Sequence, residues 1–393
     1  MTSRGKKLVG VIVGVTLAFM AAEIALRLAG VSYPVFDTYD DVRGLALRPG
    51  KRGWYRKEST AYLEINSLGY LDVEHAREKP DGVIRIAFLG DSFTEARQVP
   101  LADGFCKQVE RRLNDDARLN GMRVESLCFG VGGYGTAEEL LTLRMHVLQF
   151  APDVVVLAMF TSNDIADNSR RIASADGALS RPFYVRRDGQ LVLDDSFRDL
   201  TIAHLQRRAM LTAVHYSRLL EVANQWRRDR EIRARQARHS RPAMLLGTYD
   251  EIYAEPADEV WTEAWSITED LLGQMHADIV QAGARFVLVT VGTTAQVDPD
   301  AERRAKLQEK LGVDDLFYSE RRLRGVGQSH GFAVITLGEP MQAEADRRKV
   351  YFHGFEHVDL GHGHWNIEGH SMAAQIIADE LVNQRVVPIS RLD

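Results

Sequence analysis

One serine stands where an open α/β sheet would place a reactive group. Ser92 lies in the segment Gly90-Asp91-Ser92-Phe93-Thr94-Glu95, directly after the apolar stretch at residues 84–89. The carboxyl end of a central strand, at the entrance to a helix, is where such sheets bind ligands, and backbone N–H groups there can face a developing negative charge. The spacing is not the Gly-x-Ser-x-Gly elbow of α/β-hydrolases, because position 94 is threonine. The segment indicates a ligand site, with a simple turn as the alternative reading.

Three later segments also follow predicted strands. Residues 129–135, Phe-Gly-Val-Gly-Gly-Tyr-Gly, allow the backbone to pass close to a ligand and to present an unhindered N–H. Residues 161–164 contain Asn163, whose side-chain amide is a hydrogen-bond donor. Residues 363–370, Gly-His-Trp-Asn-Ile-Glu-Gly-His, precede a helical pattern for which Asn366 is the expected N-cap.

Strands and helices alternate through the part of the chain that carries these segments. Three of the predicted strands are almost continuously apolar, which is typical of strands covered on both faces. Amphipathic helical patterns lie between the strands, so the sequence predicts a doubly wound parallel α/β sheet. The strands are expected at residues 84–89, 123–129, 154–160, 285–291 and 333–337, and the helices around residues 105–113, 137–149 and 261–282.

The gap between the third and fourth strands exceeds a hundred residues and is too long for one crossover. Within it, residues 183–193 alternate in polarity around Asp188-Gly189, which predicts a β-hairpin. A long helical stretch follows from about residue 199 to 240. We expect an insertion at about residues 165–260 that covers the site.

Taken in order, the four segments resemble the blocks of the SGNH/GDSL hydrolase family, in particular its membrane-anchored bacterial members. The resemblance spans about residues 84–381 and implies a flavodoxin-like three-layer α/β/α fold, within a hydrolase domain at residues 81–385, and ester chemistry. It implies that Ser92 is the nucleophile and His364 the general base. The N–H groups of Ser92 and Gly133 and the amide of Asn163 would form the oxyanion hole. It implies no metal ion and no organic cofactor.

The sequence departs from this family in two blocks. Thr161 and Ser162 replace the usual start of the third block, although Asn163 keeps the donor. The family places an aspartate two or three residues before the catalytic histidine, where this chain has His362 and Gly361. Asp359 and Glu356 are the nearest carboxylates in the sequence, and we expect Asp359 to orient His364. A Ser–His dyad held by a backbone carbonyl is the alternative.

The N-terminus predicts a membrane anchor. Arg4, Lys6 and Lys7 precede apolar residues that continue to position 29 around Glu23 and Arg27. As one helix this stretch would rise about 33 Å, enough to cross a bilayer, and the two charges are spaced to pair at its far end. The basic residues predict a cytoplasmic N-terminus and an exported domain. A cleaved signal peptide and a buried helix are the alternatives.

We take residues 1–30 as the anchor and residues 31–80 as an irregular lead-in that packs on the main domain.

The net charge and the number of cysteines exclude some classes of protein. The net charge of −6 over 393 residues gives no general reason to expect nucleic-acid binding. Cys106 and Cys128 are too few for a disulfide scaffold or a cysteine-based zinc module, and we expect buried free thiols.

Clusters of histidine, arginine and tryptophan can each be explained by structure as well as by function. Five histidines at positions 353, 357, 362, 364 and 370 match no zinc spacing, and His370 is expected in the first turn of the last helix. Seven arginines between residues 227 and 241 predict a solvated helix face, with contact to anionic headgroups or an acidic polysaccharide as the alternative. Trp261 and Trp265 share a helix face and are expected in the core.

The function predicted from these features is a serine esterase or deacylase, anchored in the inner membrane and facing the periplasm or the cell exterior. Its expected substrates are acyl esters of carbohydrate or lipid. An O-acyltransferase acting on cell-envelope or exported polysaccharide is the second hypothesis, since an acyl-enzyme can pass its acyl group to a sugar hydroxyl instead of water. A catalytically silent carbohydrate-binding relative is the third.

Overall fold

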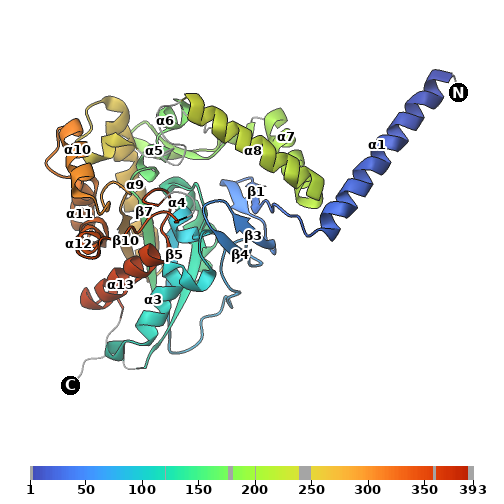
Figure 1. Cartoon of the computed structure of the whole chain (residues 1–393). Helices are drawn as coiled ribbons and strands as arrows, with labels where there is room; N and C mark the ends of the chain where they lie inside the picture. Colours follow the sequence, from blue (N-terminus) through green and yellow to red (C-terminus); the bar gives the residue numbers. More distant parts are fainter. Residues whose placement is uncertain are drawn as a thin grey trace.

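A five-stranded parallel sheet forms the centre of the protein (Figure 1). The computed structural model describes residues 3–119, 121–175, 180–199, 201–238, 249–356 and 360–387. The strand order is β11-β10-β7-β5-β6, and each neighbouring pair is parallel. All five predicted strands are present to within one residue at either end. They are β5 (Val83–Gly90), β6 (Arg123–Gly130), β7 (Val154–Phe160), β10 (Arg285–Val291) and β11 (Ala333–Thr336).

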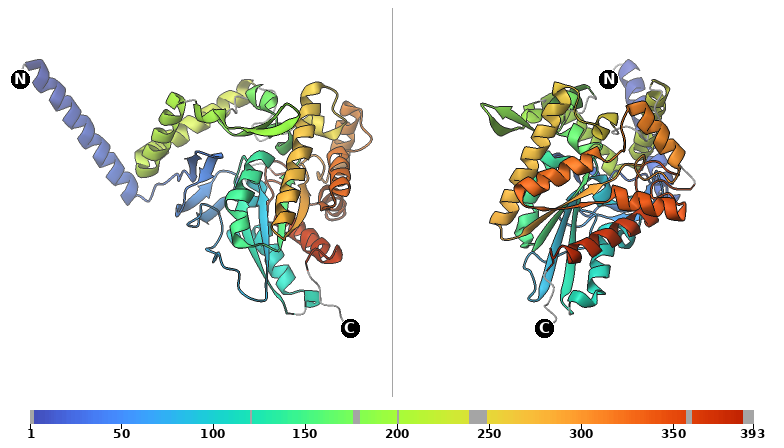
Figure 2. Two further views of the ribbon diagram at one scale, coloured as in Figure 1. Left: turned by 180° about the vertical axis from the view of Figure 1, so that it is seen from behind. Right: turned by 90° about the vertical axis from the view of Figure 1, so that its left-hand side faces the viewer.

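Helices cover both faces of this sheet, which confirms the three-layer α/β/α fold (Figure 2). One face carries α4 (Thr136–Met145), α9 (Glu259–Gln281) and α11 (Tyr318–His330). The other carries α3 (Phe105–Asn114), α12 (Gly338–Arg348) and α13 (Ile367–Asn383).

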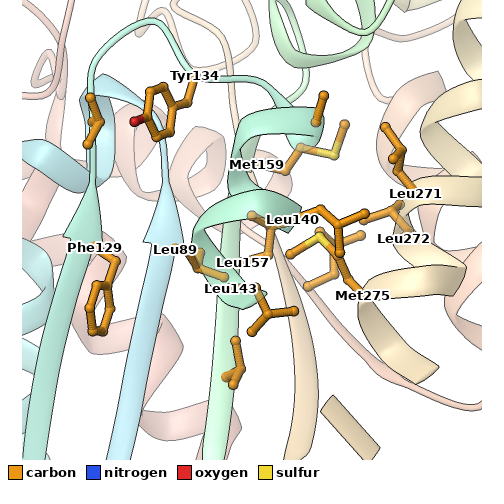
Figure 3. Close-up of a cluster of buried hydrophobic side chains, with 14 of the residues drawn as sticks. Leu89, Phe129, Tyr134, Leu140, Leu143, Leu157, Met159, Leu271, Leu272 and Met275 are labelled. Atoms are coloured by element: carbon orange, nitrogen blue, oxygen red, sulfur yellow. The ribbon is translucent and has the colours of Figure 1, made fainter. Parts of the chain in front are cut away.

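The core on the α4 and α9 side shows why these strands are apolar along their whole length. Leu140 and Leu143 of α4 lie between Leu157 of β7 and the side chains of Leu272 and Met275 on α9 (Figure 3). All five side chains are completely buried. Because the opposite face of the sheet is covered in the same way, alternate residues of a central strand enter two different cores. Trp261 and Trp265 lie in the first of these cores, as expected.

The lead-in was expected to be irregular, but it contains two β-hairpins, and its buried apolar residues belong to the core of the main body. The hairpins are formed by β1 (Asp37–Asp40) with β2 (Gly44–Leu47) and by β3 (Arg52–Arg56) with β4 (Thr60–Glu64). Tyr55 and Leu63 are buried, and Tyr134 of the second block donates a hydrogen bond to the carbonyl of Leu45 at 2.7 Å. The turn between β3 and β4 contains Glu58.

A buried arginine on the sheet forms hydrogen bonds with the end of the lead-in. Arg85 on β5 is fully buried, and its Nε donates to Glu125 on β6 at 2.7 Å. Its two terminal nitrogens donate to the carbonyls of Ala76, Arg77 and Phe150 at 2.7, 2.9 and 2.9 Å.

Replacing this arginine is expected to weaken the fold. Arg85→Leu would leave a partly buried carboxylate and several carbonyls without their donor, so we expect the free energy of unfolding to fall by about 3–5 kcal/mol. Arg123→Leu, at the exposed start of β6, is the matched control and should change it by less than about 0.5 kcal/mol. Denaturant unfolding of the three proteins measures the difference, and equal midpoints would contradict this role of Arg85.

The segment between β7 and β10 contains the predicted hairpin and helices. The hairpin is β8 (Phe183–Arg187) and β9 (Gln190–Asp194), and both Asp188 and Gly189 of its turn have positive φ, 51° and 76°. The expected long helix is instead two helices, α7 (Thr201–Tyr216) and α8 (Arg218–Arg238). They are separated at Ser217, whose hydroxyl accepts a hydrogen bond from the N–H of Leu220 at the start of α8. Part of the arginine run lies on α8, where Arg227 and Arg230 are exposed.

Three short helices are α2 (Ser92–Glu95), α5 (Asp164–Asp167) and α6 (Arg170–Ala175). A longer helix, α10 (Ala301–Leu311), follows β10. Both cysteines are free and buried, and they come from α3 and β6.

The N-terminal helix α1 (Ser3–Leu28) extends away from the main body (Figure 1). Within the described residues, α1 is the one helix that is long and apolar enough to cross a membrane, since an 18-residue window inside Arg4–Leu28 has a mean hydropathy of 2.2. Its apolar side chains are exposed. The sequence therefore forms the expected long apolar helix, and the protein buries none of it in a core.

The C-terminal end of α1 meets the insertion. Glu23 accepts hydrogen bonds from the N–H groups of Arg218 and Leu219 at 2.9 and 3.0 Å, so its carboxylate satisfies free donors in the first turn of α8. Arg27 pairs with Glu23 at 2.7 Å and donates to the carbonyl of Tyr216 at 2.8 Å. The two charges of the apolar helix thus pair with each other, as expected, and also bind the junction of α7 and α8.

Candidate active site

Ser92 and His364 meet at the carboxyl end of the sheet, although 272 positions separate them in the chain. Ser92 begins α2, directly after β5, and His364 lies in the loop before α13. The distance from Ser92 Oγ to His364 Nε2 is 2.8 Å. Asn366 caps α13 as expected, since its Oδ1 accepts from the N–H of Gly369 at 3.0 Å. Its own amide donates to the carbonyl of Tyr351 at 2.8 Å, and this holds the loop that carries His364.

The other ring nitrogen of His364 faces Glu58 of the lead-in. His364 Nδ1 lies 2.8 and 3.0 Å from the two carboxylate oxygens of Glu58. The backbone N–H of His364 also points to this carboxylate, at 3.3 Å. Asp359, the expected partner, lies outside the described residues, and Glu356 is exposed. Sequence reasoning did not identify Glu58, which lies 306 positions before the histidine.

Glu58 is itself held in place by two neighbours. Tyr55 Oη and Gln98 Nε2 lie 3.2 and 3.3 Å from Glu58 Oε1. Burial alone would raise the pKa of Glu58, but hydrogen bonds and the charge of His364 outweigh it and lower the pKa to about 2. The carboxylate is therefore ionised at neutral pH.

The contact with Glu58 also shifts the pKa of His364. Burial favours the neutral imidazole, whereas the hydrogen bond and the negative charge of Glu58 raise the pKa of His364 above its ordinary 6.5. A raised pKa makes the imidazole a stronger base toward Ser92, and the carboxylate fixes the proton on Nδ1, so that Nε2 is free to accept.

The glycine-rich block approaches the Ser92 turn very closely. A Cβ on Gly130 would lie 2.3 Å from the backbone nitrogen of Glu95, and one on Gly132 would lie 3.4 Å from Ser92 Cβ. The N–H of Gly132 is occupied by Glu95 Oε2 at 2.6 Å. Gly133 has φ +84° and open space around it, and no hydrogen bond in the described part of the chain uses its N–H. Of the two, Gly133 is the glycine whose N–H is available to a ligand.

Asn163 lies on the opposite side of the Ser92 turn, at the N-cap of α5. Its buried Oδ1 has no hydrogen-bond partner among the described residues. Asp91 accepts from the N–H of Phe93 at 2.9 Å and so caps α2, while its other oxygen lies 3.4 Å from Ser92 Oγ. Burial raises the pKa of Asp91 to about 6. The three predicted donor positions, at residues 92, 133 and 163, thus follow the neighbouring strands β5, β6 and β7 at the carboxyl edge of the sheet.

The remaining histidines of the C-terminal cluster have separate positions. His370 lies in the first turn of α13 as expected, buried, with the N–H of Phe105 donating to its Nδ1 at 3.3 Å. His353 is buried beside Trp365, and His357 lies outside the described residues. Across the residues with assigned positions, no group of three or more His, Cys, Asp or Glu side chains is arranged to hold a metal ion.

Comparisons with known proteins give structural neighbours and no sequence relatives. No family model matches the chain, and no curated protein matches it. An acetyl xylan esterase, AlAXEase, is similar over 76% of this chain and 100% of its own, at 14% identity and a TM-score of 0.39. The lipase/acylhydrolase from Enterococcus faecalis is similar over 77% of this chain and 96% of its own, at 15% identity and a TM-score of 0.37.

A putative GDSL-like lipase from Parabacteroides merdae is similar over 77% of this chain and 96% of its own, at 9% identity and a TM-score of 0.40. The sequence blocks on which the resemblance to the SGNH/GDSL hydrolases rests follow strands of the expected three-layer α/β/α fold, and the first and last of them meet where Ser92 contacts His364.

Proposed function

We propose that this protein is a serine ester hydrolase in which Ser92, His364 and Glu58 form the catalytic triad. The observation that carries the proposal is the hydrogen-bonded chain from Ser92 Oγ through both ring nitrogens of His364 to a partly buried carboxylate. A hydroxyl, an imidazole and an ionised carboxylate in this order are the parts of an activated nucleophile.

The reaction follows from this order of groups. His364 Nε2 takes the proton of Ser92 as Oγ bonds to the acyl carbon of the ester, and Glu58 stabilises the imidazolium that forms. The C–O bond to the alcohol then breaks, and His364 gives the proton to the departing alcohol. Water repeats the sequence with the acyl-enzyme and releases the carboxylic acid. The negative charge of each tetrahedral intermediate is stabilised by the N–H groups of Ser92 and Gly133 and by the amide of Asn163.

The oxyanion role of Asn163 has a testable consequence. Asn163→Ala should lower kcat by about 10²–10³-fold with little change in KM, because the donor acts on charge that develops only in the transition state. Steady-state kinetics on p-nitrophenyl acetate measures both constants. A change confined to KM would mean that Asn163 binds the ground state and is not part of the oxyanion hole.

Hydrolysis and transfer are separated by supplying acceptors. The full chain in detergent is incubated with p-nitrophenyl acetate, with and without a sugar acceptor, and released acetate and acetylated sugar are both quantified. Acetate as the main product supports the hydrolase, whereas acetylated sugar in excess would support the O-acyltransferase hypothesis. A fluorophosphonate probe that fails to label Ser92 would favour the silent relative.

We also propose that α1 is a retained anchor that places the domain on the periplasmic or outer side of the inner membrane. The support is the contact of Glu23 with the start of α8 and of Arg27 with the end of α7, since cleavage after the apolar stretch would remove a carboxylate that caps a helix. The basic residues before α1 favour a cytoplasmic N-terminus. Intact mass of the protein extracted from membranes should include residues 1–30, and a mass lacking them would show a cleaved signal peptide.

A further inference from the structure

The loop that contains Gly133 is a tight turn with glycine at both of its central positions. The N–H of Tyr134 donates to the carbonyl of Val131 at 3.2 Å, and Gly133 has φ +84°, which are features of a type II turn. Gly132 and Gly133 lie between these two residues. Because glycine has the widest choice of backbone angles, two in succession need contacts from outside the turn to keep the Gly133 N–H in one orientation.

One such contact comes from the short helix that carries Ser92. Glu95, the last residue of α2, accepts a hydrogen bond from the N–H of Gly132 through its Oε2 at 2.6 Å. The side chain of Glu95 is only 1% exposed, so water does not compete for this hydrogen bond. A Cβ on Gly132 would lie 2.9 Å from the same carboxylate oxygen and 3.4 Å from Ser92 Cβ. The turn therefore lies directly against Glu95 and beside the proposed nucleophile.

An arginine connects Glu95 to the lead-in. Arg97 Nε donates to Glu95 Oε1, and a terminal nitrogen of Arg97 donates to Asp37 of β1 at 2.6 Å. Side chains two positions apart do not face each other on a helix, but Ala96 ends α2 with φ 54°, and the chain changes direction there. Burial raises the pKa of Glu95 above its ordinary 4.5, and the positive charge of Arg97 limits this rise. Arg97 thus favours the ionised form of the carboxylate that binds the turn.

The hairpin of β1 and β2 contacts the turn a second time. Tyr134, labelled in Figure 3, is buried, and its hydroxyl donates to the carbonyl of Leu45 on β2 at 2.7 Å. Asp37 and Leu45 belong to the two paired strands of this one hairpin. The residues on both sides of Gly133 are therefore connected to the same part of the lead-in, through Glu95 before it and through Tyr134 after it.

We infer that Glu95 is a positioning residue of the oxyanion hole and that Arg97 and Asp37 hold it in place. Glu95 fixes the turn so that the N–H of Gly133 faces the negative charge that develops on the ester carbonyl oxygen. The inference rests on the proposed function and gives the lead-in a second role in it, besides supplying Glu58. Because this charge is present only in the transition state, the contribution of Glu95 should appear in kcat and not in KM.

Four variants of the full chain in detergent test this role. Glu95→Met removes the acceptor for the Gly132 N–H, whereas Glu95→Gln keeps a carbonyl oxygen that can accept it. Asp37→Asn removes the charge that holds Arg97, and Asp41→Asn is the matched control, because Asp41 is exposed in the turn of the same hairpin. Each protein is assayed on p-nitrophenyl acetate and on its thiono analogue, in which sulfur replaces the carbonyl oxygen.

The thiono analogue distinguishes a misplaced oxyanion hole from a loss of folded protein. Sulfur is a weak hydrogen-bond acceptor, so an intact oxyanion hole favours the ester over its thiono analogue. Glu95→Met is expected to lower kcat for the ester by about 10–100-fold with little change in KM, and to lower the ester-to-thiono ratio of kcat by about tenfold. Glu95→Gln should recover most of both losses. Asp37→Asn should shift both quantities in the same direction by about threefold, and Asp41→Asn should shift neither.

The ratio decides the outcome because it does not depend on the amount of folded enzyme. An unchanged ester-to-thiono ratio in Glu95→Met would overturn the inference, even if kcat fell. Should Glu95→Met fail to fold, Asp37→Asn supplies the same test, and a ratio equal to that of Asp41→Asn would then overturn it.

The failure of the proposed function has a different signature. In that case the unmodified chain hydrolyses neither compound, and a fluorophosphonate probe does not label Ser92. Hydrogen exchange of the peptide that contains residues 130–135, measured by mass spectrometry, still reports on the turn without turnover. Faster exchange in Glu95→Met than in the unmodified chain and Asp41→Asn supports the hold of Glu95 on the turn, and equal exchange in all three proteins overturns it.

Discussion

Ser92→Ala is expected to reduce ester hydrolysis by about 10⁵–10⁶-fold. Ser92 Oγ is the atom that forms the acyl-enzyme in the proposed reaction, and His364 is 2.8 Å from it. Removal of a triad nucleophile leaves only the catalysis that the oxyanion donors and substrate binding supply. Rates with p-nitrophenyl acetate measure the loss, and a fluorophosphonate probe reports independently whether position 92 still reacts.

Two further variants make this expectation specific. The double variant Ser92→Ala with His364→Ala should be no slower than either single variant, because the two residues act as a unit. Ser266→Ala, on the surface of α9, is the matched control and should keep full activity. If Ser92→Ala retained a substantial part of the activity, the nucleophile would have to be another residue.

Glu58→Gln is the second large effect and is expected to lower kcat by about 10²–10⁴-fold. The amide keeps the size of the side chain but removes the charge that stabilises the imidazolium, and it can turn its NH₂ toward Nδ1 and stabilise the wrong tautomer. Glu64→Gln, at the exposed end of β4 in the same hairpin, is the control and should leave the rate unchanged.

The pH profile distinguishes this role of Glu58 from a structural one. His364 must be neutral to accept a proton, so kcat/KM falls as the pH is lowered through its pKa, which Glu58 raises above 6.5. Without the carboxylate the pKa of His364 drops, and the acid limb of the profile should move to lower pH while the plateau also drops. A lower plateau with an unmoved acid limb would indicate loss of folded protein instead.

The sequence was sufficient to predict the sheet and the meeting of Ser92 with His364. Long apolar strands can be recognised in a sequence because both of their faces are buried. Parallel strands also bring their carboxyl ends to one edge of the sheet. Segments that follow different strands are therefore brought to the same edge by topology, which is why we expected residues 92, 133 and 163 to lie there.

Glu58 could not be found in this way. It belongs to the turn of a small hairpin that precedes the sheet, and no motif surrounds it in the chain. Its position depends on how the lead-in packs, for example on buried Tyr55 and Leu63 and on the hydrogen bond from Gln98. The one sequence signal was indirect, namely the absence of an acid at the two positions before His364 where the family has one.

The two charges within α1 also show that contacts between distant parts of the chain could not be predicted from the sequence. Their spacing predicted the pair between Glu23 and Arg27, which needs only the geometry of one helix. Their contacts with Tyr216 and Arg218 depend on a partner almost two hundred residues away. Likewise, the pattern indicated helix across residues 199–240 but not the break at Ser217, where the capping carboxylate comes from α1.

The most direct test of the proposed triad sets Glu58 against Asp359. The rate of fluorophosphonate labelling at Ser92 is measured across pH, by mass spectrometry of the labelled peptide, for the unmodified chain, Glu58→Gln and Asp359→Asn. We expect Glu58→Gln to slow labelling by at least about 10²-fold and Asp359→Asn to label at the unmodified rate. Slow labelling of Asp359→Asn with full reactivity of Glu58→Gln would contradict the triad and return the acid to the histidine loop.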